Sequence, residues 1–598
     1  MPHTYPPDTG RDVPRDAGIP QHPRCPHLNI TDLTAAPSAT ESAVSSRTPE
    51  GHVASIKPSR WNTPEFYFYY LMFVIVVPYM VYVPMRISRD SHPNFEKYAH
   101  YLRPGWMAPE YDNSDIQYRL FREQLGLVVG LASVYAVAGY ILRVTTPPSM
   151  HKAVRTAFLG ISSAVFLGAL HGINALKLAA IVAANYVLVK TISRVSTKVA
   201  LPVMWVFNCA LLFTVFYTDG MPFRMLAPHY SWLDEYAGLL PRWYISYNFS
   251  MLRLVSFASD YCWATDGYDA VSTSSSASNI TSNAAGNTAG GNAVSSTARE
   301  RSSTPRPLSE YSLTNALVYA LYPPLFVAGP IVTFNDFSAQ LERPLNLRIK
   351  TVAMYAGRVA ISLLTMEFIL HYIHVNAIKN AHAWRGDTPL ELCMIGFWSL
   401  VFVWLKLMLP WRLFRLWALM DGVDTPENMI RCVANNYSTL AFWRSWHRSY
   451  NLWVVRYIYV PVGGSRNLLP AALLVFTFVA LWHDLSFTLL AWAWLVTLFI
   501  APEVIAARLL PASKYEQHGW YRHVCAVGAV FNILMMMTAN LVGFVVGVDG
   551  VQELWAAIVH DWNGILTLLG ACICLFIGAQ LMFEYREEER RRGIFRRC

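Results

Sequence analysis

Charged residues are scarce in this chain of 598 residues: only 15% are Asp, Glu, Lys or Arg, whereas 54% are hydrophobic. A soluble globular protein carries about 25% charged residues, so this deficit excludes an ordinary soluble domain and indicates a membrane protein. Nucleic-acid motifs and a long basic stripe are also absent, so the formal net charge of +9 does not indicate a nucleic-acid partner. Basic segments on the cytoplasmic side of membrane spans explain it better.

Closely spaced cysteine pairs are absent as well. The nine cysteines are scattered and contain no CxxC pair, so the sequence predicts neither a disulfide framework nor a zinc site. We therefore expect no metal and no tightly bound cofactor, and we expect Cys432 to be a small buried residue. An internal repeat of fixed period is not visible either, whereas many transporters contain one.

Three segments lie outside the apolar part of the chain. Residues 1–58 are rich in polar residues and proline, which predicts a disordered tail without the hydrophobic region of a secretory signal. Residues 270–307, rich in Ser, Ala, Asn and Gly, are typical of a flexible surface loop inserted between spans. Residues 586–598 form a charged C-terminal tail that we expect in the cytoplasm. Residues 59–585 are then one membrane domain.

About a dozen apolar stretches within this domain are long enough to cross or re-enter a membrane. Because several are short or polar, we predict about ten transmembrane helices with additional re-entrant segments, in an all-α polytopic membrane protein. The segment 427–465 is helical in pattern but too charged to face lipid, so protein or a water-filled cavity should cover it. The stretches lie at residues 66–83, 125–143, 154–170, 172–190, 201–218, 313–334, 353–378, 392–409, 470–482, 485–501, 522–547 and 563–583.

Two histidines stand out, because an imidazole at membrane depth costs free energy and therefore indicates a functional site. His483 interrupts a long apolar run, and His447 lies in a tract rich in arginine and aromatic residues. A neutral imidazole in apolar surroundings can take a proton from an alcohol and return it later. We therefore interpret His483 as a general base for acyl transfer, most plausibly from a thioester, with His447 as its partner.

The tract around His447 is predicted to be one helix over residues 442–460. On this helix Trp443, His447 and Asn451 share one face, and Arg444 and Arg448 share the next. Arginine matches phosphate with two parallel hydrogen bonds, so these guanidinium groups are candidates for binding an anionic group. An ordinary cluster of cytoplasmic charges is the competing interpretation. The Gly463-Gly464 pair that follows is either an anion-binding turn or a simple loop.

A third polar cluster is predicted in the span at 353–378. Glu367, His371 and His374 fall on one face of a helix, at a spacing that could bind a metal. Such a stripe more often lines a polar seam between helices, and we favour that interpretation.

The block from Trp443 to Trp453, continued by Arg456–Arg466 and by Leu481-Trp-His483, resembles the signature of membrane-bound O-acyltransferases. Ala328–Phe337 resembles the upstream motif of that family. Within this family, the chain most specifically resembles the Gup (glycerol uptake protein) branch. That branch is also similar to Hedgehog acyltransferase. The resemblance to the Gup branch is carried by residues 252–257, 366–371, 428–438 and 534–544.

The resemblance implies a multi-pass enzyme of the endoplasmic reticulum membrane with a central tunnel. Acyl-CoA would be the co-substrate, for which Arg444, Arg448, Asn451 and Arg456 are the candidate binding residues. His483 matches the catalytic histidine, whereas His447 occupies a second polar position with a supporting role. The implied acceptor is the lyso-glycerolipid of a glycosylphosphatidylinositol anchor. The alternatives are a secreted protein as acceptor, or a role as a transporter, or as a transport accessory, for glycerol or another solute.

Overall fold

The computed structural model describes residues 58–275, 298–344, 349–594 and 596. Within these residues nine helical segments are long and apolar enough to cross a membrane, which confirms the all-α polytopic class. They are α1 (Pro64–Ile87), α3 (Ile116–Thr145), the segment Pro148–Ser193, α6 (Thr197–Tyr217), α12 (Ile349–Tyr372), α14 (Pro389–Met420), α18 (Phe487–Leu509), α20 (Tyr521–Phe544) and α22 (Trp562–Arg591).

The segment Pro148–Ser193 is not one straight helix. A helix of its 46 residues would be about 70 Å long, more than twice the thickness of the hydrocarbon core. It divides at Gly172, whose φ of 53° lies in the left-handed region, and a Cβ there would stand 2.0 Å from the carbonyl oxygen of Tyr236. Two helices result, α4 (His151–His171) and α5 (Ala175–Ser193), as the sequence predicts. Taken as two spans, they bring the count close to the predicted ten.

A buried helix and a broken stretch differ from the sequence prediction. The 33-residue α7 (Trp243–Ser275) was not predicted as a span, because buried polar residues such as Arg253 and Asp260 interrupt its apolar pattern. The stretch predicted at 313–334 is instead α9 (Leu313–Ala320), α10 (Pro323–Phe326) and a turn before α11 (Phe334–Glu342). Two prolines at the start of α10 explain the interruption, since proline cannot continue a preceding helix.

The predicted surface loop at 270–307 is shorter in the structure. Its first residues continue α7 to Ser275, and after residues outside the described part the chain forms α8 (Ala298–Ser303). Arg301 of α8 is buried and donates to the Asp336 carboxylate of α11 at 2.5 Å. The end of the insert is therefore attached to the membrane domain. The predicted disordered tail, residues 1–58, lies outside the described residues except for its last position.

The polar cluster of α12 is a seam between elements. Arg122 of α3 donates two hydrogen bonds to Glu367, at 2.6 and 2.8 Å, and the indole of Trp106 donates a third. Trp106 lies between the short antiparallel strands β1 (Leu102–Pro104) and β2 (Glu110–Asp112). His371 contacts the same loop, because its Nε2 lies 3.3 Å from the backbone N–H of Trp106. His374 lies beyond the end of α12, directly before α13 (Val375–Asn380), and so does not extend the stripe.

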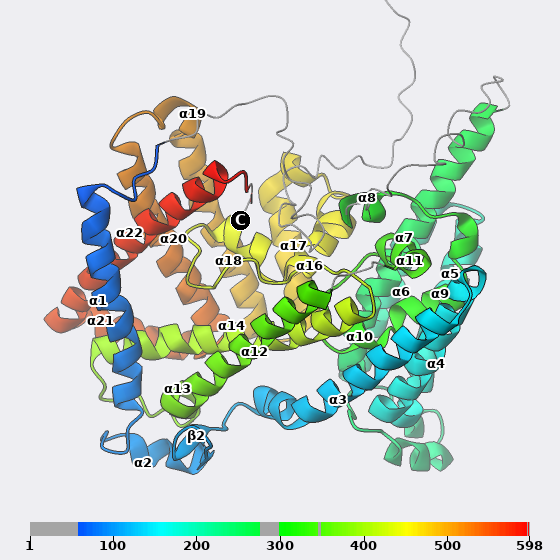
Figure 1. Ribbon diagram of the computed structural model, residues 1–598, viewed down its shortest axis with the longest axis horizontal. Coiled ribbons are helices and arrows are strands. Elements are labelled where there is room, and N and C mark those ends of the chain that lie inside the picture. Colours follow the sequence, from blue (N-terminus) through cyan, green and yellow to red (C-terminus); the bar gives the residue numbers. More distant parts are fainter. Residues whose placement is uncertain (1–57, 276–297, 345–348, 595, 597–598) are drawn as a thin grey trace, which may run out of the picture.

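The charged tract around His447 lies between two groups of helices (Figure 1). α1 lies beside α22 and α14 on one side, while α4, α5, α6, α7 and α9 pack together on the other. Between them lie α16 (Arg448–Val454) and α17 (Leu468–His483). Most of the described side chains of the charged tract at 427–465 are buried or half-buried, so protein covers it as predicted.

The charged C-terminal residues are not a free tail, because α22 continues to Arg591. Glu589 is buried and pairs with Arg431 at 2.6 Å and with Arg596 at 3.0 Å. Arg586 of the same helix donates to the carbonyl of Asn435 at 2.7 Å. The end of α22 therefore fixes the loop that precedes the tract around His447.

Replacing Glu589 by Leu should lower the stability of the protein, because Arg431 would remain buried without this carboxylate. Removal of one partner from a buried ion pair costs about 3–5 kcal/mol. The control is Glu587→Leu on the same helix, where Glu587 pairs with the largely exposed Arg590. Thermal unfolding in detergent should show a clearly lower midpoint for Glu589→Leu only, and equal midpoints would contradict the role of the pair.

Candidate active site

The predicted helix over 442–460 is broken at His447. α15 (Thr439–Ser445) ends before it and α16 begins after it, while His447 itself has a φ of 43° and a ψ of 51°. A left-handed conformation is uncommon for a residue other than glycine. The prediction of one continuous helix is therefore wrong, and Arg444 and Arg448 lie on different helices.

Asn428 stabilises this break from the preceding loop. Its carbonyl accepts the backbone N–H of Arg448 at 3.2 Å, and its side-chain oxygen accepts the N–H of Ser449 at 3.0 Å. The hydroxyl of Ser449 accepts the N–H of Ile331 at 2.8 Å. The first N–H groups of a helix have no partner within it, so these bonds both satisfy and orient the start of α16.

The two ends of the tract are also attached to other helices. The carboxylate of Glu503, in α18, accepts the N–H groups of Thr439 and Leu440 at the start of α15, at 2.8 and 3.3 Å. At the other end, the π-helix Val455–Tyr459 follows α16. Its Arg456 forms an ion pair of 3.0 Å with Asp260 of α7. His447 is therefore held between fixed elements on both sides.

His483 is the last residue of α17, and the turn that carries it is bound to α7. The side-chain amide of Asn248 donates to the carbonyl of Trp482 at 3.0 Å. In return, the indole of Trp482 donates to the carbonyl of Asn248 at 2.8 Å. Trp482 is buried, whereas the side chain of His483 is exposed.

Both histidines line one cavity of about 1390 Å³, together with Asn451 and side chains of α1, α14, α20 and α22. A run of stacked rings connects them. The ring of His447 lies 4.5 Å from that of Trp411 and 5.3 Å from that of Tyr450. Tyr450 in turn stacks at 4.7 Å on Trp482, the neighbour of His483.

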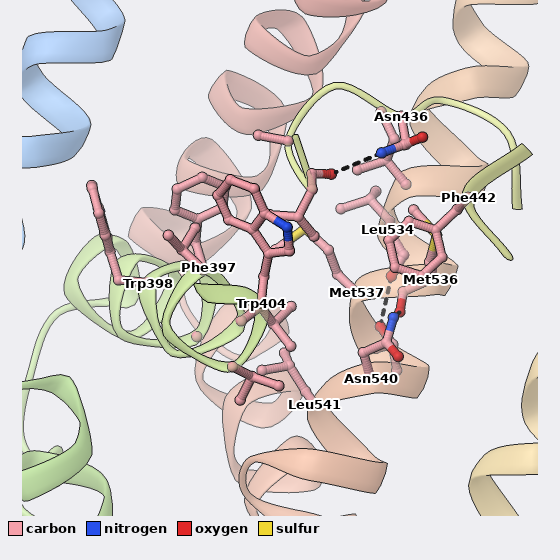
Figure 2. Close-up of a pocket in the computed structure, with 18 of the residues that line it drawn as sticks. Phe397, Trp398, Trp404, Asn436, Phe442, Leu534, Met536, Met537, Asn540 and Leu541 are labelled. Carbon is pink, nitrogen blue, oxygen red and sulfur yellow. Dashed lines mark hydrogen bonds between the residues drawn. The ribbon is translucent and has the colours of Figure 1, made fainter. Parts of the chain in front are cut away.

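Figure 2 shows a mainly apolar part of this cavity, lined by Phe397 and Trp404 of α14 and by Leu534 and Met537 of α20. Asn436 also lines it, and its amide donates to the carbonyl of Cys432 at 2.9 Å (Figure 2). Cys432 is exposed on this cavity, which corrects the expectation that it is buried. A long hydrocarbon chain is the type of ligand that such a lining favours.

A second, more open cavity of about 510 Å³ shares His483 with the first. Its lining includes the polar residues Asp484, Ser486 and Thr488 and residues at the end of α20. His483 is thus accessible from an apolar cavity and from a more polar one. That position suits a group that brings a hydrocarbon chain and a polar reactant together.

Several buried polar atoms of the large cavity have no hydrogen-bond partner in the described part of the chain. They are Nε2 of His447, the hydroxyl of Tyr450, the side-chain oxygens of Asn436 and Asn451, and the indole nitrogens of Trp404 and Trp443. An unpaired buried polar group costs about 1–3 kcal/mol, and each such group in a native structure calls for an explanation. Hydrogen bonds to a bound substrate would supply the missing partners.

The predicted acyl-CoA residues are not gathered in one place. Asn451 lines the large cavity, but Arg444, Arg448 and Arg456 line neither cavity. Arg456 is engaged by Asp260, and its guanidinium lies 4.9 Å from the ring of Trp263. Gly463 and Gly464 form a turn with φ values of 107° and 57°, which glycine adopts without strain.

Three residues that hold the site were missed by the sequence analysis: Asn248, Asn428 and Glu503. The sequence pattern around Asn248 and Asn428 does not reveal a role for either side-chain amide. A role for Glu503 could have been predicted from the sequence, because a carboxylate within the apolar helix α18 should have a partner.

Comparisons with known proteins agree with this geometry. The model of the "membrane-bound O-acyltransferase family" matches residues 196–548, which include both histidines. Membrane-bound O-acyltransferase GUP1 of Saccharomyces cerevisiae is 43% identical over 545 residues, covering 91% of this chain and 94% of the relative. Membrane-bound O-acyltransferase GUP2 of the same yeast is 38% identical, covering 94% of this chain and 93% of the relative.

A more distant similarity extends to protein-cysteine N-palmitoyltransferase HHAT of Mus musculus, which is 27% identical over 294 residues. That match covers 46% of this chain and 58% of the relative. The family match extends over more than half of the chain, and the two yeast relatives align with nearly all of it. The chain therefore belongs to the membrane-bound O-acyltransferase family and is a multi-pass membrane acyltransferase.

Proposed function

We propose that this enzyme transfers a fatty acyl group from acyl-CoA to a hydroxyl group of a membrane lipid, with His483 as the general base. The observation that carries the proposal is the position of His483, which lines both the apolar cavity and the more polar one. The acyl chain lies in the first cavity, and the acceptor hydroxyl approaches from the second.

In the reaction, one proton moves from the acceptor hydroxyl to His483 and then from His483 to the leaving thiolate. His483 removes the hydroxyl proton while the oxygen attacks the thioester carbonyl. When the tetrahedral intermediate collapses, the carbon–sulfur bond breaks and the imidazolium returns the proton to the leaving thiolate. An ester and free CoA are the products.

His447 has a supporting role in this proposal. Its Nε2, the Tyr450 hydroxyl and the Asn451 amide oxygen are the unpartnered polar atoms of the cavity that lie close together in sequence. They would hydrogen-bond to the reacting thioester and hydroxyl groups and fix their orientation. The left-handed conformation of His447 makes this orientation specific, because neighbouring residues hold the backbone on both sides.

The size of the large cavity favours a lipid acceptor. Pockets for one drug-sized ligand measure about 300–1,000 Å³, and this cavity exceeds that range at about 1390 Å³. It can hold the acyl chain of the donor together with a hydrocarbon chain of the acceptor. A lysolipid satisfies this condition, and the resemblance to the Gup branch indicates the lyso form of a glycosylphosphatidylinositol anchor, acylated at its free glycerol hydroxyl. We propose the endoplasmic reticulum membrane as its location, which the same resemblance supports.

A secreted protein is the second candidate acceptor, since the distant mouse relative is a protein-cysteine N-palmitoyltransferase by name. Direct glycerol transport is the third function that the sequence left open. The three functions differ in what can be measured: acylation of a lipid, acylation of a peptide, or uptake of glycerol.

Replacing His483 by Ala should reduce acyl transfer by about 10²–10⁴-fold, the usual contribution of a general base. The measurement uses microsomes, radiolabelled palmitoyl-CoA, and either a lyso-anchor lipid or a peptide acceptor. The control is His523→Ala, since His523 lines neither cavity. Full activity of His483→Ala would overturn the mechanism. Transfer to the peptide alone would replace the lipid acceptor, and glycerol uptake without any acyl transfer would favour the transporter.

Arg444 and Arg448 remain our candidates for binding the phosphates of acyl-CoA. Arg444 is only half-buried, so its replacement should be tolerated by the fold. We expect Arg444→Gln to raise the KM for acyl-CoA about tenfold, as the loss of one charge-assisted hydrogen bond would, with kcat unchanged. Initial rates at varied acyl-CoA measure this. The control is Arg508→Gln on α18, and an unchanged KM in Arg444→Gln would remove Arg444 from the binding site.

A further inference from the structure

The C-terminal turn of α17 leaves backbone carbonyls without partners inside the helix. In a continuing helix the carbonyl of Trp482 would accept the N–H of residue 486. Ser486, however, is the N-cap residue of α18, which begins at Phe487, so this bond does not form. The side-chain amide of Asn248, 234 positions away in sequence, donates to the carbonyl instead, at 3.0 Å.

The contact between Asn248 and Trp482 is reciprocal. The indole N–H of Trp482 donates to the carbonyl of Asn248 at 2.8 Å. Two hydrogen bonds in opposite directions fix both the end of the helix axis and the rotation of the indole ring. The ring of Phe249, next to Asn248, meets the same indole edge-on at 5.4 Å.

His483 depends on this contact because it is the next residue after Trp482. Few other bonds hold the turn: the N–H of Asp484 donates to the carbonyl of Ala480 at 3.1 Å. The backbone of Asp484 is already extended, with a φ of −168°, so the helix offers no support beyond His483. The direction of the imidazole between the two cavities is then set largely through Trp482.

We propose that Asn248 is a positioning residue for His483. Its amide caps the last turn of α17 from α7 and thereby holds the imidazole where both cavities meet it. This inference rests on the proposed function, in which His483 is the general base. The role requires a donor at position 248, which asparagine provides and which aspartate or leucine of similar size does not.

Kinetics of the full-length enzyme in microsomes test the proposal, with radiolabelled palmitoyl-CoA and a lyso-anchor lipid. Asn248→Leu and Asn248→Asp should lower kcat about 10- to 100-fold and leave the KM for acyl-CoA unchanged, since a small displacement of a reacting group has an effect of this size. Asn248→Gln carries the same donor on a longer arm and should recover part of kcat. Wild-type kcat in Asn248→Leu and Asn248→Asp would overturn the assignment.

Asn185→Leu is the matched control for a loss of folding. Asn185 is buried in α5, its amide donates to the carbonyl of Ile181 at 2.9 Å, and it lines neither cavity. This variant loses that bond and also the one in which the side-chain oxygen of Asn185 accepts from the amide of Asn208 at 2.7 Å, both within the membrane domain and away from the cavity that Asn248 lines. Its kcat per folded molecule should equal that of the wild type. A loss as large as that of Asn248→Leu would show that removal of a buried hydrogen bond anywhere in the domain has this effect, and it would overturn the positioning role.

A second measurement does not depend on the acceptor. Diethyl pyrocarbonate modifies accessible imidazoles, and mass spectrometry reads the rate at each histidine. Release of the terminal turn in Asn248→Leu should change the modification rate of His483 but not that of His447. If His483→Ala is inactive but the Asn248 variants keep the kcat of the wild type, the positioning role is refuted and the proposed base stands. An active His483→Ala refutes the proposed base whatever the Asn248 variants show.

Discussion

The left-handed backbone of His447 is the constraint on which the rest of the site depends. Such a conformation costs about 1–3 kcal/mol and persists only where the surroundings determine it. Here Asn428 accepts the two N–H groups that follow the break, and Glu503 accepts the two that open α15. The break turns the ring of His447 onto Trp411 and places it in the wall of the cavity. A continuous helix would have carried the ring along a different face.

Polar residues far from the signature therefore hold the residues within it. Asn248 secures the turn before His483, Asp260 pairs with Arg456, and Glu589 pairs with Arg431 beside the loop of Asn428. Each of these groups is buried or half-buried, so it would be costly without a partner. The same cost makes the pairs specific, since few alternative arrangements satisfy every donor and acceptor at once.

The sequence predicts well whatever is local and periodic. The long apolar helices follow from composition, and His483 is found because an imidazole interrupts an apolar run. The break at His447 could not be predicted, because nothing near it in sequence supplies its partners: Asn428 and Glu503 lie 19 and 56 positions away. The helix α7 was missed for a related reason. Its buried Arg253 and Asp260 look like surface residues until their partners on other elements are known.

The arginines of the signature illustrate how one motif serves two purposes. Arg456 lies in the most specific block of the family resemblance, yet its charge is neutralised by Asp260 and its plane covers Trp263. A guanidinium held this way fixes the π-helix after α16 and has little freedom to follow a phosphate. Arg444 carries no such buried ion pair among the described contacts and is only half-buried. Sequence similarity treats these arginines alike, whereas burial and ion pairing distinguish Arg456, which is held by Asp260, from the half-buried Arg444.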